Sequence, residues 1–210
     1  MKKLVKDALI LTAITLIAGC LLGLVYEITK EPIKKAQYNA QQKAYKTVFA
    51  DAESFLDYAA FDVEEAAKAV ADSGYPDNTI EGVVVAEDAS GETLGYVITV
   101  TSHAGYGGDI TFSMGVQKDG TLNGYSITSI SETAGLGMKA KEEKFYSQFE
   151  EKQAEAFDVV KGTSSLDQEI EAISGATVTS KAMTYGVDAG LAYFRATFLG
   201  NIEEGGSADE

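Results

Sequence analysis

The longest uninterrupted apolar run of the chain lies near its N-terminus. Residues 8–26 carry no charged side chain, and they follow three lysines within the first six residues. These nineteen residues would rise about 28 Å as a helix, close to the thickness of the hydrocarbon core of a bilayer. We therefore expect one transmembrane helix over 8–26, with Tyr26 at the far interface. The short basic N-terminus favours a cytoplasmic segment over 1–7 in a single-pass cell-membrane protein, with the main domain extracytoplasmic.

Two other interpretations of this run stay open. Ala18 and Gly19 fit the small-residue site of a cleaved signal peptide, although the apolar run continues for seven residues beyond them. The sequence Ile-Ala-Gly-Cys at 17–20 is similar to a lipoprotein processing site, although a chain cut there would begin with an unusually apolar tether. We favour the uncleaved anchor, in which Cys20 is a small apolar residue facing lipid.

The spacing of apolar positions changes along the rest of the chain. Helical spacing predicts helices over 29–50 and 62–72, within a helical membrane-proximal region over 27–78; residues 51–60 are ambiguous. Strand-like alternation then predicts four strands joined by short connections, over 80–87, 94–101, 110–116 and 122–130. Helical patterns return over 139–153 and after Ser174, with a short strand over 157–160 between them.

These elements predict an α+β fold. Short strands joined by tight turns form an antiparallel sheet. We expect an N-terminal transmembrane helix followed by an antiparallel-sheet domain over 79–199 with flanking helices. Residues 200–210 are acidic and glycine-rich, and we expect this tail to be disordered.

Charge and composition exclude several classes of function. The net charge of −15 argues against nucleic-acid binding and against a peripheral domain lying on anionic lipid. One cysteine and one histidine cannot form an intrachain disulfide, a Cys/His metal cluster or an iron–sulfur centre. The histidine, His103, has no partner acid at a recognisable spacing, which disfavours Ser/His hydrolysis. We therefore expect no catalytic acid–base residue and no metal site, so redox chemistry would need an organic cofactor.

Three loops rich in glycine or hydroxyl residues lie at strand ends or at the start of a helix. They cover residues 102–109, 131–137 and 174–180. Exposed backbone in several loops allows close approach to a flat, phosphorylated ligand. The last loop leads into a helix, whose first turn leaves N–H groups free and can receive a phosphate. Each loop taken alone is better explained as a turn or a helix cap, and that alternative stays open at this point.

The order of the motifs in these loops resembles the FMN-binding domain family. Residues 174–180, Ser-Gly-Ala-Thr-Val-Thr-Ser, resemble its flavinylation motif. Upstream, Gly-Tyr-Gly-Gly at 105–108, Asp-Gly-Thr-Leu-Asn-Gly at 119–124 and Glu-Thr-Ala-Gly-Leu-Gly at 132–137 match in the same order. The family includes the RnfG proteins of Rnf-type ion-translocating electron transport complexes and the related NqrC of sodium-pumping NADH:quinone reductases. The length of the chain favours the Rnf-type members.

The resemblance implies that a flavin transferase attaches FMN through its phosphate to Thr177. Only a hydroxyl can form this phosphoester, so serine could replace Thr177 but alanine could not. The N–H groups at residues 178–180 would hold the phosphate. The candidate cofactor-binding residues implied are Gly107, Gly108, Glu132, Thr133, Gly135, Leu136, Gly137, Ser174, Gly175, Ala176, Thr177, Val178, Thr179 and Ser180.

Two positions depart from the pattern of the family. Glu171 stands where an aspartate usually precedes the motif serine by three residues, which keeps the charge and lengthens its reach. Ala134 replaces the usual proline of the upstream loop, which should loosen that loop without removing its backbone amides.

The resemblance implies a membrane-anchored electron-transfer subunit of a complex that couples ferredoxin:NAD+ electron transfer to Na+ or H+ translocation. Its partners would be the other integral-membrane and redox subunits, membrane lipid and, during maturation, the flavin transferase. The alternatives are a stand-alone extracellular covalent flavoprotein, an NqrC-like subunit, and an anchored binding domain without flavin. Whether Tyr106 or Tyr125 stacks on the flavin ring stays open as well.

Overall fold

The computed structural model describes residues 2–199. Met1 and residues 200–210, including the tail expected to be disordered, lie outside the described residues. The chain divides into two compact units, Met1–Ala40 and Gln41–Glu210. The second unit thus begins well before residue 79, where we expected the sheet domain to start.

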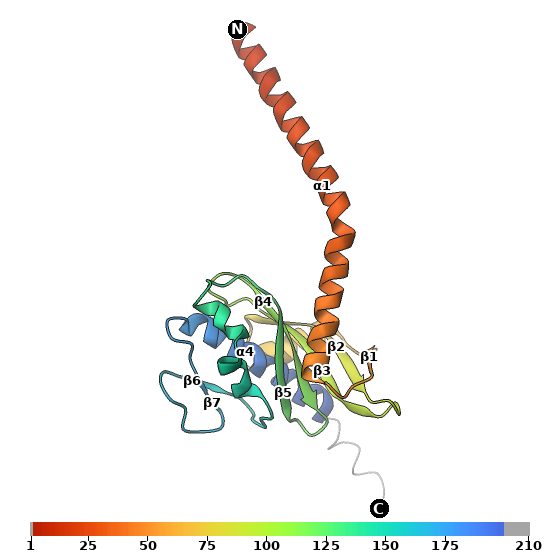
Figure 1. Cartoon of the computed structure of the whole chain (residues 1–210), viewed down its shortest axis with the longest axis vertical. Helices are drawn as coiled ribbons and strands as arrows, with labels where there is room; N and C mark the ends of the chain where they lie inside the picture. Colours follow the sequence, from red (N-terminus) through yellow and green to blue (C-terminus); the bar gives the residue numbers. More distant parts are fainter. Residues whose placement is uncertain (1, 200–210) are drawn as a thin grey trace, which may run out of the picture. The chain divides into compact units, whose positions relative to one another are not determined.

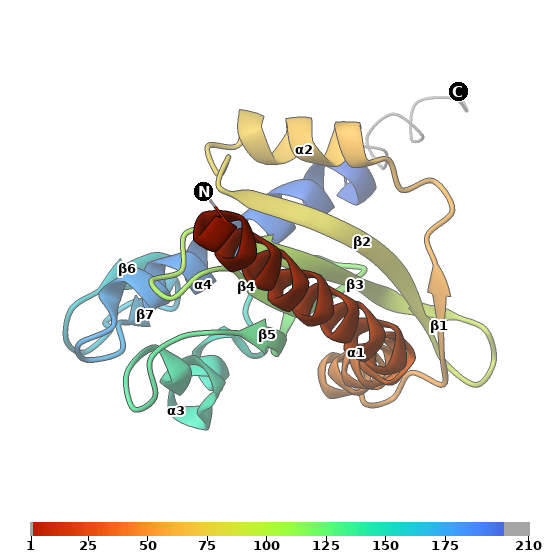
Figure 2. The same cartoon turned by 90° about the horizontal axis from the view of Figure 1, so that it is seen from above.

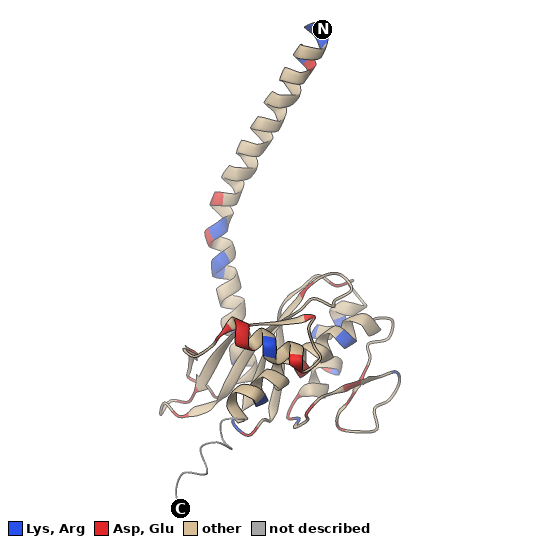
Figure 3. Ribbon diagram, turned by 180° about the vertical axis from the view of Figure 1, so that it is seen from behind, with Lys and Arg blue, Asp and Glu red and all other residues tan. Residues whose placement is uncertain are grey.

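A single continuous helix, α1 (Lys2–Val48), contains the expected anchor and most of the helix expected over 29–50, and it ends two residues before the expected end. Pro32 lies inside this helix. The helix is long and apolar enough to cross a membrane, by length and composition. Residues 8–26 form its uncharged part, and Figure 3 shows this part without a coloured residue.

An antiparallel sheet of five strands forms the centre of the second unit. The four expected strands are present and are joined by a further strand in the ambiguous segment 51–60. The order in the sheet follows the chain: β1 (Ser54–Asp57), β2 (Asn78–Glu87), β3 (Thr93–Ser102), β4 (Ile110–Gln117) and β5 (Leu122–Ile130) (Figure 1). The α+β fold with an antiparallel sheet is therefore confirmed.

The alternation of side chains along the strands gives the sheet two apolar faces. One face, which includes Ile98 and Val100, packs in the main core with α2 (Val63–Asp72) and α4 (Thr177–Phe194). Figure 2 shows α2 and α4 on the same side of β2. The opposite face, with Val84 and Val97, packs against the end of α1 through Tyr45 and Val48. Burial on both faces explains why the central strands are rich in Val and Ile.

The prediction of one helix over 139–153 is wrong. The segment forms three short turns instead: η1 (Gly137–Lys141), α3 (Glu143–Tyr146) and η2 (Ser147–Phe149). The backbone is extended at Glu142, with ψ 143°. Ala140, Phe145 and Phe149 are all buried, and a straight helix would turn Ala140 away from the two phenylalanines. The break lets all three side chains reach the core.

The C-terminal part of the chain brings a short parallel pair of strands next to α4. The pair is β6 (Asp158–Val160), which overlaps the short strand expected there, and β7 (Glu169–Glu171), which the acidic sequence did not predict. Residues 172–176 lead from β7 directly into α4. A π-helical turn, η3 (Arg195–Leu199), ends the described chain.

Candidate functional site

The three glycine- and hydroxyl-rich loops meet at one cavity of about 630 Å³. Ile110 at the start of β4 pairs with Ile130 at the end of β5, so the loop before β4 and the segment after β5 emerge at the same end of the sheet. The start of α4 completes the cavity, whose volume is in the range of small-molecule sites. The lining residues are Tyr106, Glu132, Thr133, Leu136, Gly137, Gly175, Ala176, Thr177, Val178 and Thr179.

The helix start at this cavity has no side-chain cap. The N-cap residue of α4 is Ala176, and no side chain accepts a hydrogen bond from its first turn. The interpretation of residues 174–180 as a helix cap made by a serine or threonine side chain, which stayed open above, is therefore wrong. The first-turn N–H groups of Thr177, Val178 and Thr179 have no earlier helical carbonyl to pair with. They leave positive partial charge at the cavity, where an anion is stabilised.

Ser180 does not take the phosphate-holding role that we expected. Its N–H donates to the carbonyl of Ala176 at 3.0 Å. Its hydroxyl accepts from the N–H of Ile173 at 2.9 Å and donates to the same Ala176 carbonyl at 3.0 Å. Ser180 is fully buried and fixes the entry of the chain into α4. Its N–H was expected to be free because the sequence does not fix the residue at which α4 begins.

Three threonines border the cavity, and they differ in access. Thr179 is 1% exposed, whereas Thr177 is half-buried and Thr133 is exposed. Thr177 also borders a second hollow of about 470 Å³, which Lys161 and Thr163 line as well. Of the two threonines in the first turn of α4, Thr177 is therefore the one that an enzyme could reach from outside.

A buried carboxylate joins the loops beneath the cavity. Glu132 is 8% exposed, and its Oε1 accepts hydrogen bonds from the N–H of Tyr106 at 2.7 Å and of Gly107 at 3.2 Å. A Cβ added at Gly137 would lie 2.7 Å from the Glu132 Oε2 and 2.6 Å from the Thr179 Oγ1. Only glycine fits at 137, because the Glu132 carboxylate and the Thr179 hydroxyl occupy the space that a Cβ would need.

Five of the expected residues do not line the cavity: Gly107, Gly108, Gly135, Ser174 and Ser180. Ser174 borders the second hollow together with Thr177. Tyr106, whose stacking on the flavin was left open, does line the cavity, whereas its neighbours Gly107 and Gly108 do not. Its flanking glycines at 105, 107 and 108 are the signal that could have identified it, because they leave Tyr106 as the only large side chain at the loop tip.

His103 does have a partner acid, contrary to our expectation. Its Nδ1 lies 3.0 Å from the Asp109 Oδ1, and its Nε2 lies 3.0 Å from the Thr79 Oγ1. The two residues stand at the ends of the loop that carries Tyr106, so the pair fixes the base of that loop. The side chains of His103 and Asp109 are 46% and 63% exposed, so their contact is a surface interaction.

A buried acid inside α4 was also missed. Asp188 is 1% exposed and accepts hydrogen bonds from the N–H of Phe157 at 2.9 Å and from the Tyr75 hydroxyl at 3.3 Å. Burial raises the pKa of Asp188 to about 7, against the lowering effect of these two hydrogen bonds. Burial, followed by the neighbouring Asp188, raises the pKa of Tyr75 to about 12. The signal in the sequence was an acid at helical spacing within an apolar face.

The cavity fits a flavin nucleotide. Tyr106, Leu136 and Val178 give its rim an apolar character suited to a flat ring. The uncapped start of α4 suits a phosphate, and the Thr177 hydroxyl lies at that helix start. The fold and the site thus define a flavin-nucleotide-binding α+β domain that follows an apolar N-terminal helix.

Comparison with known proteins assigns the chain to a family. The model of the FMN-binding domain matches residues 105–192, and that of the RnfG N-terminal region matches residues 1–48. The chain is 34% identical over 196 residues to the G subunit of the Na(+)-translocating ferredoxin:NAD(+) oxidoreductase complex of Acetobacterium woodii, a match that covers 92% of this chain and 93% of that protein. It is 33% identical over 179 residues to the corresponding subunit of the proton-translocating complex of Clostridium ljungdahlii, covering 84% of each chain. The chain belongs to the RnfG family of these ion-translocating oxidoreductase complexes.

A more distant relative and a solved structure are also similar to this chain. The G subunit of the ion-translocating oxidoreductase complex of Methanosarcina acetivorans is 28% identical over 199 residues, covering 93% of this chain and 96% of that protein. The crystal structure of Shewanella oneidensis NqrC matches 58% of this chain and 60% of that chain, at 22% identity and a TM-score of 0.48.

Proposed function

We propose that this chain is the FMN-carrying electron-transfer subunit of an Rnf-type complex that couples ferredoxin:NAD+ electron transfer to Na+ or H+ translocation. FMN is held by a phosphoester to Thr177, which a flavin transferase forms during maturation. Helix α1 anchors the subunit in the cell membrane with its N-terminus in the cytoplasm and its main domain outside. The integral-membrane and redox subunits of the complex are its partners.

The observation that carries this proposal is the meeting of the three loops around Thr177. A hydroxyl at the first position of an uncapped helix places the esterified phosphate next to free N–H groups, which favour its negative charge. The adjoining cavity has room for the rest of the nucleotide on one side of Thr177. Thr177 also lines the second hollow, which offers a further approach to this residue.

The residues of this site bind and orient the cofactor rather than act on a substrate. FMN supplies the redox chemistry when bound. Glu132 holds the Tyr106 loop against the segment after β5, and Gly137 allows that segment to pass close to Thr179. A covalent bond suits a domain outside the cytoplasm, because a cofactor that dissociated there would be lost.

The test is covalent flavin on the full-length protein, produced together with a flavin transferase. We expect a fluorescent band on a denaturing gel and a mass gain of one FMN less one water. Thr177→Ala should remove both signals, because no hydroxyl remains at 177. Thr177→Ser should keep both, because serine supplies the hydroxyl.

Thr179→Ser is the matched control, since it changes a neighbouring threonine and keeps the one proposed to be modified. A fluorescent band in Thr177→Ala would contradict attachment at this residue. A dark band in the wild-type protein, in cells whose transferase modifies another substrate, would contradict the flavin proposal as a whole. Co-purification of the other complex subunits with the wild-type protein tests the place of this chain in the complex.

A further inference from the structure

Exposed apolar side chains gather at the rim of the cavity. Tyr106 is 76% exposed, Val178 is 51% exposed and Leu136 is 41% exposed, and all three line it. The described part of the second unit, residues 41–199, exposes only seven large apolar side chains: Leu56, Val63, Tyr106, Leu136, Leu166, Val178 and Tyr185. Three of these seven therefore border one cavity, and such a cluster marks a surface that a ligand covers.

The backbone beneath Tyr106 is fixed although its ring is exposed. The Glu132 Oε1 accepts from the N–H groups of Tyr106 and Gly107 at 2.7 and 3.2 Å. A Cβ at Gly107 would lie 2.3 Å from the carbonyl oxygen of Ser131, so the loop tip is pressed against the segment after β5. The pair of His103 and Asp109 holds the base of the loop. A ring on a fixed backbone loses little conformational freedom when a flat ligand binds it.

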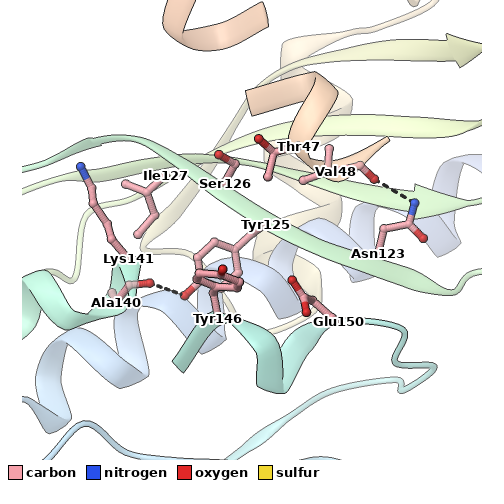
Figure 4. Close-up of a pocket in the computed structure, with 10 residues that line it drawn as sticks. All are labelled: Thr47, Val48, Asn123, Tyr125, Ser126, Ile127, Ala140, Lys141, Tyr146 and Glu150. Atoms are coloured by element: carbon pink, nitrogen blue, oxygen red, sulfur yellow. Dashed lines mark hydrogen bonds between the residues drawn. The ribbon is translucent and has the colours of Figure 1, made fainter. Parts of the chain in front are cut away.

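Tyr125 can be set aside as a flavin-stacking residue. Its ring is 6% exposed and packs against Phe112 and Phe149 at centroid distances of 5.6 and 5.3 Å. Its hydroxyl donates to the carbonyl of Ala140 at 2.8 Å. Figure 4 shows this bond in a separate cavity of about 300 Å³, which Tyr125 lines together with Tyr146. Tyr125 is therefore a core residue at another cavity.

We infer that Tyr106 is the positioning residue that stacks on the isoalloxazine ring of the FMN held at Thr177. This inference rests on the proposed function. An aromatic face stacks on the flat oxidised ring more favourably than on the electron-rich reduced ring. Tyr106 therefore favours the oxidised flavin and lowers its reduction potential, and its phenol quenches flavin fluorescence on contact.

The test uses the full-length flavin-carrying protein with Tyr106→Leu and Tyr106→Phe. Fluorescence on a denaturing gel measures attachment, and fluorescence of the folded protein per attached flavin measures stacking. We expect equal attachment in the wild type and both variants, because the bond is made at the Thr177 hydroxyl, which neither variant changes. In the folded protein, Tyr106→Leu should raise flavin fluorescence about threefold to tenfold. One aromatic contact shifts the equilibrium between stacked and unstacked flavin by about this factor.

The reduction potential gives an independent measurement. Tyr106→Leu should shift the reduction equilibrium about threefold to tenfold toward the reduced flavin, which is about 15 to 30 mV for a two-electron couple. Tyr106→Phe keeps an aromatic face but no phenol, so it should keep the wild-type potential while fluorescence rises. Tyr185→Leu is the matched control, because Tyr185 is 40% exposed on α4 and does not line the cavity. It should change neither quantity.

The outcomes separate this inference from the proposed function. A wild-type band that is dark on the denaturing gel contradicts flavin attachment itself. A bright band combined with unchanged folded-state fluorescence and potential in Tyr106→Leu overturns the stacking role while leaving attachment at Thr177 intact. A change of equal size in Tyr185→Leu would also overturn it, because the effect would then not depend on the cavity.

Discussion

Replacing Asp188 by asparagine should make the stability of the domain less dependent on pH. Asp188 lies in the middle of α4 and accepts hydrogen bonds from the Phe157 N–H and the Tyr75 hydroxyl. Arg195 and Asp158 are the charged groups that act on it, in opposite directions. Asparagine has nearly the same shape and can accept from Phe157 and bond to Tyr75, but it does not titrate.

The size of the effect follows from the raised pKa. Burial raises the pKa of Asp188 from 3.8 to about 7 in the folded protein. Between these values the folded chain keeps a proton that the unfolded chain releases, so the free energy of unfolding falls as pH rises. This decrease in the free energy of unfolding is absent below about pH 4 and complete above about pH 7, where it reaches about 4 kcal/mol. Between pH 5 and pH 8 the loss is about 2 to 3 kcal/mol.

The measurement is urea unfolding of the full-length protein in detergent at pH 5 and pH 8, followed by circular dichroism. From about pH 5 to pH 8, we expect the free energy of unfolding to fall by about 2 to 3 kcal/mol more in the wild type than in Asp188→Asn. Asp57→Asn is the control, because Asp57 is exposed on β1. An equal loss in wild type and Asp188→Asn would refute the reasoning, since another group would then carry the pH dependence.

Two further predictions concern the packing beneath the cavity. Gly137→Ala should destabilise the domain by about 1 to 3 kcal/mol and reduce flavin attachment, because the new methyl group collides with Glu132 and Thr179. Thermal unfolding measures the first effect and gel fluorescence the second. An unchanged melting temperature would contradict the close packing. Glu132→Ala should cost about 1 to 3 kcal/mol because two loop N–H groups lose their acceptor, whereas Glu132→Gln should cost less, since both bonds end on Oε1 and glutamine keeps that oxygen. Equal melting temperatures for the two Glu132 variants would show that the carboxylate does not hold the loop.

The central sheet could be predicted because alternation along a strand is a local property. Residues 80–130 alternate or run apolar between clear turns, and all four expected strands are present. The segment over 139–153 has apolar residues at mixed spacing, and its break at Glu142 depends on the position of the core around Phe145 and Phe149. Strand β7 likewise exists because β6 lies beside it, and its own acidic sequence gives no sign of a strand.

The site was predictable as a set of loops but not as a geometry. The glycine and hydroxyl motifs identified three segments, while their meeting at one cavity depends on the pairing of Ile110 with Ile130 and on the path of α4. The inward turn of Ser180, the exposure of Tyr106 and the contact of His103 with Asp109 depend on the path of the folded backbone, which residue type does not show. Residue type alone cannot distinguish a serine that fixes the chain from one that faces a ligand.

The alanine at the start of α4 has a consequence for the chain before the proposed attachment of FMN. A helix that begins at Ala176 instead of at a serine, threonine or aspartate lacks about 0.5 to 2 kcal/mol of stabilisation. A phosphate esterified to Thr177 would fill that deficit, because it lies beside the same N–H groups. The chain without its cofactor would then open more often at this end of α4 and would be cleaved there by proteases more readily than the flavin-carrying chain.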